Sequence, residues 1–294
     1  MLDYHLHLWE HTSAETPMVL DQLAAYCEAA QANGVVELAM TEHLHRFVQI
    51  GDVVGRFWDD PVNEPHLAPS MAKYFDHHMR ANLDDYIELC LEAKRQGLPV
   101  VIGMEVDYYR GQMDEVAELL AQYPFDVLLG SVHWVGNWQF DDIWDPVQMA
   151  EWDHRSIDRC WDAYTEALEE LAATRTCDVL AHPDVIKVAG HRPDAPQEWW
   201  DRIAEAAASS KMAAEVSSAG WRKPADEVYP APPLLARMVA KGVPLTTASD
   251  AHKLSQVADR SGDLHQLLSS TGVTQLQGYR NRQAHTVPLR PSEA

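Results

Sequence analysis

Leu2-Asp3-Tyr4-His5-Leu6-His7 lies at one end of this chain, and Thr247-Ala248-Ser249-Asp250-Ala251-His252 lies near the other. Each run has the pattern of a short strand that ends in two residues of metal-binding type, with one residue between them. Because alternate residues of an extended strand face the same way, the two ligands of each pair can reach one site. If the first and last strands are neighbours in a closed barrel, both pairs meet at the same rim.

The composition is that of an ordinary globular protein, with 294 residues that are 46% hydrophobic and 23% charged. This length suits one large α/β domain or two small ones, and it provides a core of useful size. The formal net charge of -22 argues against non-specific binding to nucleic acid or to an anionic membrane surface, since both require a basic face. An anionic substrate is not excluded, because a metal cluster can reverse the field in one pocket.

The cysteines are far apart and form no Cys-X-X-Cys motif: Cys27, Cys90, Cys160 and Cys177. We therefore expect no disulfide framework and a reducing compartment. The N-terminal segment has no basic region followed by an apolar stretch, and no apolar run approaches the length of a transmembrane helix. These features predict a soluble, cytoplasmic protein that binds neither membrane nor nucleic acid. A homodimer is left open.

Strand-like apolar runs alternate with segments of helical periodicity along the chain. The expected strands span 2–7, 35–41, 99–105, 126–132, 178–181, 212–217 and 243–249. The expected helices span 18–33, 82–96, 112–122, 151–173, 196–209, 231–241 and 255–271. Repeated alternation of this kind means parallel strands joined by right-handed crossovers, either in a closed barrel or in a doubly wound sheet.

The positions of the polar residues favour the barrel. They lie at the C-terminal ends of the expected strands: His5 and His7, Glu42 and His43, Glu105, His133, His182, Ser217 and Ser218, and Asp250 and His252. A barrel gathers these ends into one ring, whereas an open sheet would spread them along a line. We therefore expect an α/β barrel that is a single domain over 1–294, with loop insertions at about 46–80 and 134–150 and a polar tail at about 272–294.

Each of these residues has an ordinary explanation when it is taken alone. One histidine of the first pair could be buried and the other exposed, Asp250 could cap a helix, and a lone histidine could be a satisfied core residue. Their coincidence at most of the strand ends indicates metal binding instead. Imidazole and carboxylate without thiolate suit zinc, iron or manganese. The ligands are too many for one ion, so we expect two or three ions bridged by a carboxylate, an arrangement that binds phosphoryl oxygens and activates water.

These motifs resemble those of the PHP (polymerase and histidinol phosphatase) family of metal-dependent phosphoesterases. The resemblance covers residues 1–255 or so and rests on His5-X-His7, Thr41-Glu42-His43, Glu105, Ser131-Val132-His133, Ala181-His182-Pro183 and Ser249-Asp250-X-His252. Within the family, the chain is most similar to the monofunctional histidinol-phosphatases. That similarity implies a distorted (β/α)7 barrel and a trinuclear metal centre at the C-terminal ends of the strands.

The resemblance also implies how the ligands divide among the ions. The first ion would be held by His5, His7, Glu105 and Asp250. Glu105 would bridge to a second ion, which His133 and His182 would complete. The third would be held by His43, His252 and a residue from the loop after the first strand. Many relatives have an Asp or His near position 13, where this chain has Ser13, so we predict His11 rather than Glu10 as that ligand. A cluster of only two ions stays open.

The implied reaction is hydrolysis of a phosphomonoester, and we expect catalysis to depend most on Asp250, His252 and Glu105. Cations on the rim loops are candidates for contact with the substrate phosphate: Arg46, Lys187, Arg222 with its neighbour Lys223, and Lys253. The ordinary alternative for each of them is a solvated surface charge. The small phosphorylated substrate that the resemblance favours is L-histidinol phosphate, hydrolysed to L-histidinol and phosphate in histidine biosynthesis.

Other functions remain open at this stage. A PHP phosphoesterase acting on a nucleotide or another small phosphate ester would have the same fold and the same metals. A non-catalytic PHP module would show degenerate metal motifs, and these motifs are nearly intact. A metal-dependent amidohydrolase also uses a barrel rim, but it typically needs a carboxylated lysine at a strand end, which no predicted strand supplies.

Overall fold

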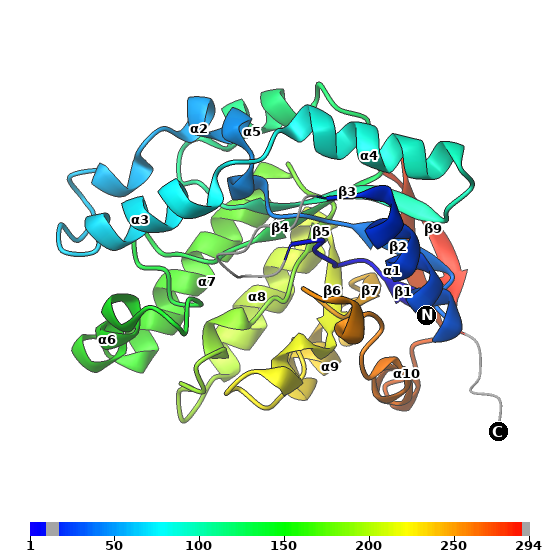
Figure 1. Ribbon diagram of the computed structural model, residues 1–294. Coiled ribbons are helices and arrows are strands. Elements are labelled where there is room, and N and C mark those ends of the chain that lie inside the picture. Colours follow the sequence, from blue (N-terminus) through cyan, green and yellow to red (C-terminus); the bar gives the residue numbers. More distant parts are fainter. Residues whose placement is uncertain (10–17, 290–294) are drawn as a thin grey trace.

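The computed structural model describes residues 1–9 and 18–289, and a seven-stranded parallel sheet forms its centre (Figure 1). The strands are β1 (Leu2–Asp3), β2 (Glu37–Met40), β3 (Val100–Asp107), β4 (Val127–Ser131), β5 (Val179–Leu180), β6 (Ala213–Ser217) and β7 (Leu245–Ala248). Each strand pairs with the next one in the chain, so the order in the sheet is the order in the sequence. The predicted alternation of parallel strands and helices is confirmed.

The first and last strands meet and nearly close the sheet into a barrel. The backbone N–H of Tyr4 donates to the Thr247 carbonyl at 2.9 Å, and the N–H of His7 donates to the Ala251 carbonyl at 2.8 Å. The Thr247 hydroxyl also donates to the Leu2 carbonyl at 2.7 Å. The distorted (β/α)7 barrel expected from the sequence is therefore confirmed, and its closure brings the two end pairs of ligands together.

Helices surround the strands and cover their outer faces (Figure 1). The connecting helices are α1 (Leu20–Ala32), α4 (Leu83–Arg95), α5 (Met113–Leu120), α7 (Ile157–Thr174), α8 (Gln197–Ser210), α9 (Pro232–Ala240) and α10 (Ser261–Ser270). Every residue of β3 is buried. Helices cover the outer face of the strand, and side chains from the other strands pack against its inner face. This burial explains why the strands are continuous apolar runs in the sequence.

The single helix predicted over 151–173 is wrong, because two helices occupy this region. Helix α6 (Pro146–His154) starts inside the predicted insertion, where the Asp145 carboxylate accepts the N–H of Val147 at 2.7 Å. Helix α7 starts afresh at Ser156, whose hydroxyl accepts the N–H of Arg159. Each start is marked by a side chain that caps the exposed backbone N–H groups, and two N-caps so close together forbid one continuous helix.

The insertion after β2 packs against the insertion after β4 on the rim of the barrel. It contains the short helix η1 (Leu44–Arg46), α2 (Val48–Val54), η2 (Phe57–Asp59) and α3 (Ala68–His78). Asn137 joins the two insertions, because its amide donates to the carbonyls of Trp58 and Glu64 and accepts the N–H of Glu64. The two long loops therefore form one layer above the strand ends.

The predicted polar tail contains a β-hairpin, formed by β8 (Gln275–Arg280) and β9 (Gln283–Pro288). Its turn residues, Asn281 and Arg282, both have positive φ values, 48° and 62°, as a two-residue hairpin turn requires. The hairpin packs on the N-terminal ends of the strands, where the N–H of Tyr279 donates to the Tyr4 hydroxyl at 3.0 Å. The sequence pattern hid it because most residues of β9 are exposed and its apolar residues form no continuous run. Within the described ranges, no helix is long and apolar enough to span a membrane.

The buried Asp3 side chain connects β1 to the segment that follows β7. Its buried carboxylate accepts the N–H and the hydroxyl of Ser249, at 2.7 and 2.8 Å, and the N–H of Ala258 at 2.9 Å. Burial raises the pKa of Asp3 from 3.8 to about 6, although these hydrogen bonds act in the opposite direction. A group whose folded-state pKa is raised in this way binds its proton more tightly in the folded state than in the unfolded one.

We therefore expect the stability of the wild type, relative to an Asp3→Asn variant, to fall as the pH rises from about 4 to about 6. Protonation of Asp3 contributes to the free energy of unfolding in full below its ordinary pKa of 3.8. This contribution, on the order of 3 kcal/mol, is lost as the pH rises past the folded-state pKa of about 6. Urea unfolding of both proteins between these pH values measures the difference. Asparagine does not titrate, so a difference that stays constant across the range would contradict the assignment.

Candidate metal centre

The C-terminal ends of the strands bring eight of the predicted ligands into one cluster at the rim of the barrel. They are His5, His7, His43, Glu105, His133, His182, Asp250 and His252. The ninth, His11, lies outside the described residues. Six of these side chains are almost entirely buried, while Asp250 and His252 keep 14% and 18% of their side-chain surface exposed. The cluster is therefore reached from the side of β7.

Glu105 lies in the middle of the cluster, and its two oxygens face different groups of histidines. Oε2 lies 3.2 Å from His5 Nε2 and 2.5 Å from His43 Nδ1. Oε1 lies 3.1 Å from His133 Nε2 and 3.0 Å from His182 Nε2. A carboxylate with one oxygen toward each of two ligand groups has the geometry of a bridge between two ions.

The group around Oε2 is completed by the two end pairs of the sequence. Asp250 Oδ1 lies 3.3 Å from His7 Nε2 and 3.9 Å from His5 Nε2. Ligand atoms of a tetrahedral zinc ion lie roughly 3.3 Å apart, since each bond is about 2.0–2.1 Å long. His5, His7, Glu105 and Asp250 are thus spaced as the ligands of one ion would be.

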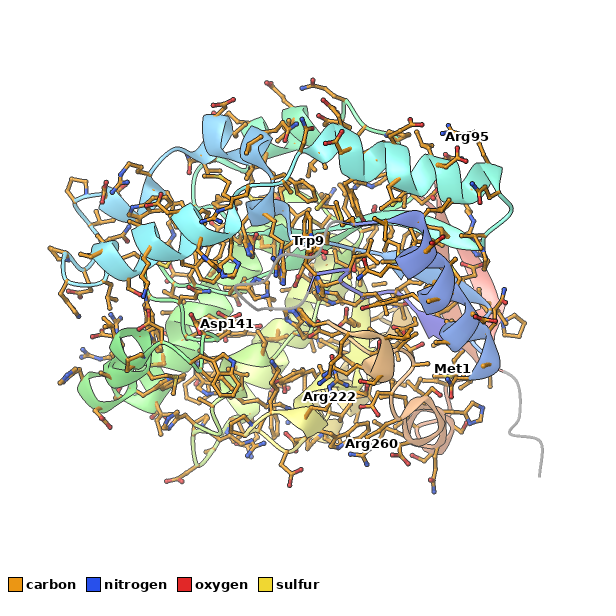
Figure 2. All side chains as sticks on the ribbon, in the orientation of Figure 1. Met1, Trp9, Arg95, Asp141, Arg222 and Arg260 are labelled. Atoms are coloured by element: carbon orange, nitrogen blue, oxygen red, sulfur yellow. The ribbon has the colours of Figure 1, made fainter. Side chains whose placement is uncertain are left out.

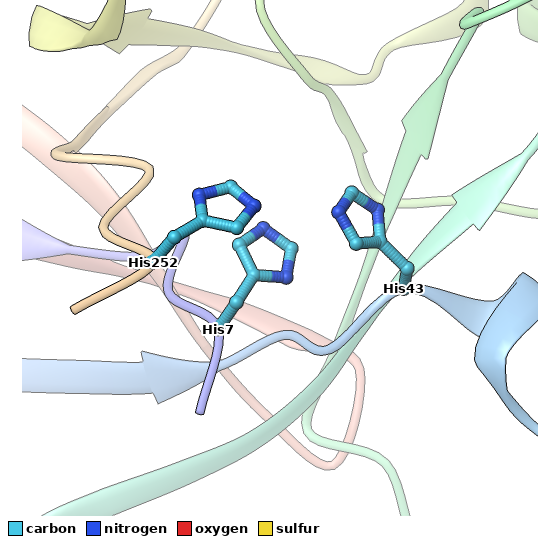
Figure 3. A group of neighbouring side chains, drawn as sticks. All are labelled: His7, His43 and His252. Carbon is cyan, nitrogen blue, oxygen red and sulfur yellow. The ribbon is translucent and has the colours of Figure 1, made fainter. Parts of the chain in front are cut away.

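A further group is formed by His7, His43 and His252, whose rings come from three separate segments and face one another (Figure 3). The His7 ring stacks on the rings of His43 and His252, with centroids 4.1 and 4.2 Å away. One nitrogen of each ring lies within 4.8 Å of the others. This is the place expected for the third ion, whose remaining predicted ligand, His11, lies outside the described residues.

Several atoms at the centre are buried without a well-formed hydrogen bond. Within the described part of the chain, this holds for His5 Nε2, His7 Nε2 and Glu105 Oε2. A buried nitrogen or carboxylate oxygen without a partner costs free energy, about 1–3 kcal/mol each and more for a charged group. Their convergence fits a centre whose cations complete the coordination of these atoms, so the donor set and its geometry suit divalent metal ions.

A second layer of carboxylates orients the histidines. Glu215 lies 2.8 Å from His5 Nδ1, Glu42 lies 3.3 Å from His7 Nδ1, and Asp107 lies 2.7 Å from His133 Nδ1. A carboxylate that accepts the Nδ1 proton leaves the Nε2 lone pair facing the centre, which is the form that binds metal. The sequence analysis missed Glu215 and Asp107. The available signal was a carboxylate inside a buried strand, and for Asp107 its position two residues beyond Glu105 on the same face.

The charges of the cluster depend on one another. Burial would raise the pKa of Glu105, but His5, His43 and His133 hold it well below its ordinary value. Burial would lower the pKa of His5, but the carboxylates of Glu215, Glu105 and Asp250 raise it well above its ordinary value. Positive charge is therefore favoured at this position, whether it is supplied by protons on imidazole or by metal cations that replace them.

Two of the cations predicted to contact phosphate have other tasks in the structure. The buried Lys187 ammonium donates to Glu227 at 2.7 Å and to the Val228 carbonyl at 2.9 Å, and it forms an ion pair with Asp184 at 2.8 Å. The prediction of a phosphate contact by Lys187 is therefore corrected: at the end of the short helix η3 (Val185–Lys187), it is a structural ion pair. Such a pair compensates buried carboxylates that would otherwise lack a counter-charge.

Arg222 supports the backbone that carries Asp250. Its guanidinium donates to the carbonyls of Ser249 and Asp250, at 2.6 and 3.1 Å, and pairs with Asp259 at 2.8 Å. Asp250 has a φ of 50°, in the left-handed region that costs a non-glycine residue free energy. Arg222 therefore stabilises a strained ligand position, and contact of its partly exposed side chain with phosphate stays a prediction.

Three other cations lie at the rim. The buried Arg46 is 3.2 Å from Glu42, the carboxylate that orients His7, and lies over the Trp9 ring. The exposed Lys253 follows His252 directly. Lys223 is close enough to His252 that its charge, after burial and the charge of His7, adds to the lowering of the histidine pKa well below its ordinary value. Contact with phosphate by any of them stays a prediction.

Comparison with known proteins agrees with this architecture. The family model of the PHP domain matches residues 3–219. A Deinococcus radiodurans protein described as a probable histidinol-phosphatase is 31% identical over 199 residues, which are 66% of this chain and 75% of that protein.

Two solved structures share the fold over nearly the whole chain. The structure of histidinol phosphate phosphatase from Lactococcus lactis, in complex with zinc, L-histidinol and phosphate, covers 97% of this chain and 98% of its own, with a TM-score of 0.65 at 19% identity. A second structure, from Listeria monocytogenes, covers 90% of this chain and 99% of its own, with a TM-score of 0.70 at 16% identity.

Proposed function

This chain belongs to the PHP family, and from that membership we propose that it hydrolyses L-histidinol phosphate to L-histidinol and phosphate, a step of histidine biosynthesis. The observation that carries the proposal is the position of Glu105 between two groups of ligand atoms. A centre of this form suits transfer of a phosphoryl group to water, because adjacent cations neutralise charge on the phosphoryl oxygens. The similarity to the Deinococcus radiodurans protein favours histidinol phosphate as the ester.

The proposed centre holds two or three divalent ions, with zinc, iron and manganese as the metals that its ligands suit. His5, His7, Glu105 and Asp250 would bind the first ion. Glu105, His133 and His182 would bind the second. His43, His252 and His11 would bind the third, and without His11 the cluster would contain two. The zinc in the Lactococcus lactis structure supports zinc as the first metal to test.

In this mechanism, bound metal ions supply Lewis acidity toward the phosphoryl oxygens and lower the pKa of water. The protein supplies a fixed ligand geometry, since Glu215, Glu42 and Asp107 hold three histidine rings with Nε2 toward the centre. The same burial excludes bulk water and strengthens the electrostatic interactions of the site. The partly exposed Asp250 and His252 mark the side from which the phosphate enters.

Turnover by the purified, metal-loaded protein tests the proposed substrate. We expect hydrolysis of L-histidinol phosphate with a kcat/KM at least about tenfold above that for nucleoside monophosphates and simple sugar phosphates, measured as released phosphate. The metal content of the same preparation is measured in parallel, so that an inactive sample without metal is not misread. Efficient hydrolysis of a nucleotide or another ester, with none of histidinol phosphate, would replace the proposed substrate while leaving the phosphoesterase assignment in place.

A further inference from the structure

The loop between β4 and α6 contains three aspartates close together, Asp141, Asp142 and Asp145. Two of them accept hydrogen bonds from the backbone of the loop. Asp142 accepts the N–H groups of Trp144 and Asp145, and Asp145 caps α6 by accepting the N–H of Val147. For Asp141, by contrast, no described residue donates to its side chain, and its Oδ1 is buried without a partner. Asp141 is thus the one aspartate of the three whose carboxylate accepts no hydrogen bond from a described residue.

The backbone that carries Asp141 is firmly held. Phe140, the residue before it, is fully buried and packs edge to face against Tyr164 of α7. Gln148 of α6 fastens the preceding residues, since its carbonyl accepts the indole N–H of Trp138 and its side-chain oxygen accepts the N–H of Gln139. Asp141 therefore stands on a rigid platform, which a binding residue requires.

Asp141 lies in the loop that leads from the end of β4 to α6, on the side of the molecule where α6 and α7 pack (Figure 1 and Figure 2). It is close enough to His133 that the two charges affect each other, and it is also near His182. The hydroxyl of Tyr229 is another buried polar group without a hydrogen-bond partner in the described part of the chain, and the Tyr229 ring lies 6.3 Å from the ring of the predicted ligand His182, measured between centroids. Two unsatisfied polar groups therefore border the centre on one side.

An unpaired carboxylate at a buried position is destabilising unless a ligand supplies donors. The nearby cation Lys223 affects Asp141 through its charge but makes no hydrogen bond or ion pair with it in the described residues. Asp142 next to it only adds negative charge. Within residues 1–9 and 18–289 the Asp141 carboxylate has no donor, and a ligand that carries positive charge and N–H donors would supply one.

We propose that Asp141 binds the ammonium group of the substrate and thereby selects phosphate esters of amino alcohols over uncharged esters. This inference rests on the proposed function, because the phosphate must occupy the metal centre for Asp141 to reach the rest of the ester. In L-histidinol phosphate the carbon next to the phosphate-bearing carbon carries an ammonium group. A phosphate at the ions therefore places that ammonium at the edge of the centre, and the loop that carries Asp141 leaves β4 at this edge, directly after the predicted ligand His133.

The test is a comparison of Asp141→Asn with Asp142→Asn. Both substitutions remove one negative charge from the same loop, and both keep a side-chain oxygen that can accept hydrogen bonds. We expect Asp141→Asn to reduce the ratio of kcat/KM for L-histidinol phosphate to kcat/KM for p-nitrophenyl phosphate about 10- to 100-fold, mainly through KM. Asp142→Asn should keep the wild-type ratio, and zinc content should be the same in all three proteins.

Binding of the product supplies a readout that is independent of turnover. Calorimetry should show that the wild type binds L-histidinol more tightly than its analogue without the amino group, and that Asp141→Asn abolishes this preference. Equal losses on both esters, or a loss of zinc from Asp141→Asn, would overturn the proposal, because they would make Asp141 a structural residue or a metal ligand.

Ammonium binding by Asp141 can also be tested if histidinol phosphate turns out not to be the substrate. If the wild type hydrolyses other esters but not histidinol phosphate, the same variants are compared on O-phosphoethanolamine and ethyl phosphate. A wild-type preference for the amino ester that Asp141→Asn removes would support ammonium binding with a different substrate. The absence of any such preference would overturn it.

Discussion

Glu105→Gln is expected to lower kcat/KM for L-histidinol phosphate at least about a thousandfold and to reduce the zinc bound per chain. Glutamine keeps the size of the side chain but loses its charge and replaces one oxygen by an NH2 group that cannot ligate. Because each Glu105 oxygen faces a different pair of histidines, either orientation of the amide leaves one ligand group without its carboxylate. Several kcal/mol of electrostatic stabilisation are lost, and each 1.36 kcal/mol corresponds to about tenfold in rate.

Kinetics and elemental analysis of the same preparation measure this effect. Glu118→Gln is the matched control, since Glu118 lies exposed on α5 and the substitution is chemically identical. Circular dichroism and the unfolding temperature show whether the barrel is intact. If Glu105→Gln retained both full activity and the wild-type zinc content in a folded protein, the bridging role of Glu105 would have to be abandoned.

Removal of bound zinc is expected to lower the Tm of the protein by about 10 °C or more. A ligand present at about a thousand times its Kd stabilises the folded state by about 4 kcal/mol, and each kcal/mol shifts the Tm of a large domain by about 2–4 °C. The physical cause is the cluster itself, which buries His5 Nε2, His7 Nε2 and Glu105 Oε2 without a well-formed hydrogen bond from the described residues. The measurement is a thermal unfolding scan before and after treatment with a chelator.

Added zinc should restore the original Tm, whereas magnesium should not, because an imidazole-rich site suits zinc and magnesium prefers oxygen ligands. The Glu105→Gln variant serves as the internal control, since it should respond much less to zinc. Identical unfolding temperatures for the chelated and the zinc-loaded wild type would show that the cluster is not a metal centre.

Most of the barrel could be predicted because its signals are local. Buried parallel strands are continuous apolar runs, and Gly34 and Gly97, both at positive φ, end α1 and α4 where the sequence indicates. The hairpin β8–β9 escaped prediction because a strand that packs on the barrel with one face only has few apolar residues. The break between α6 and α7 escaped because periodicity spans it, while the caps at Asp145 and Ser156 decide it.

In the metal centre, too, the residues with a local sequence signal were predicted, and those defined by tertiary contacts were not. Strand-end histidines and carboxylates stand out in a sequence, and His5, Glu105 and Asp250 do converge. The orienting carboxylates carried a weaker signal. Glu215 acts on His5 from 210 residues away in the chain, and the contact of Asp107 with His133 forms only when β3 and β4 pair. Likewise, Lys187 resembles any other rim cation in the sequence, and only its contacts with Asp184 and Glu227 show that it is occupied.

The sequence by itself determined that this chain alternates strands and helices, that most strands end in metal-binding residue types, and that the end pairs around His7 and Asp250 belong to one site. These properties follow from periodicity and spacing, which are local and linear. The tertiary structure alone decided which atoms face each other: the division of Glu105 between two ligand groups, the loss of Lys187 and Arg222 as free cations, and the unsatisfied Asp141. The physical reason is that partners such as His5 and Glu215 are brought together only when β1 and β7 close the barrel.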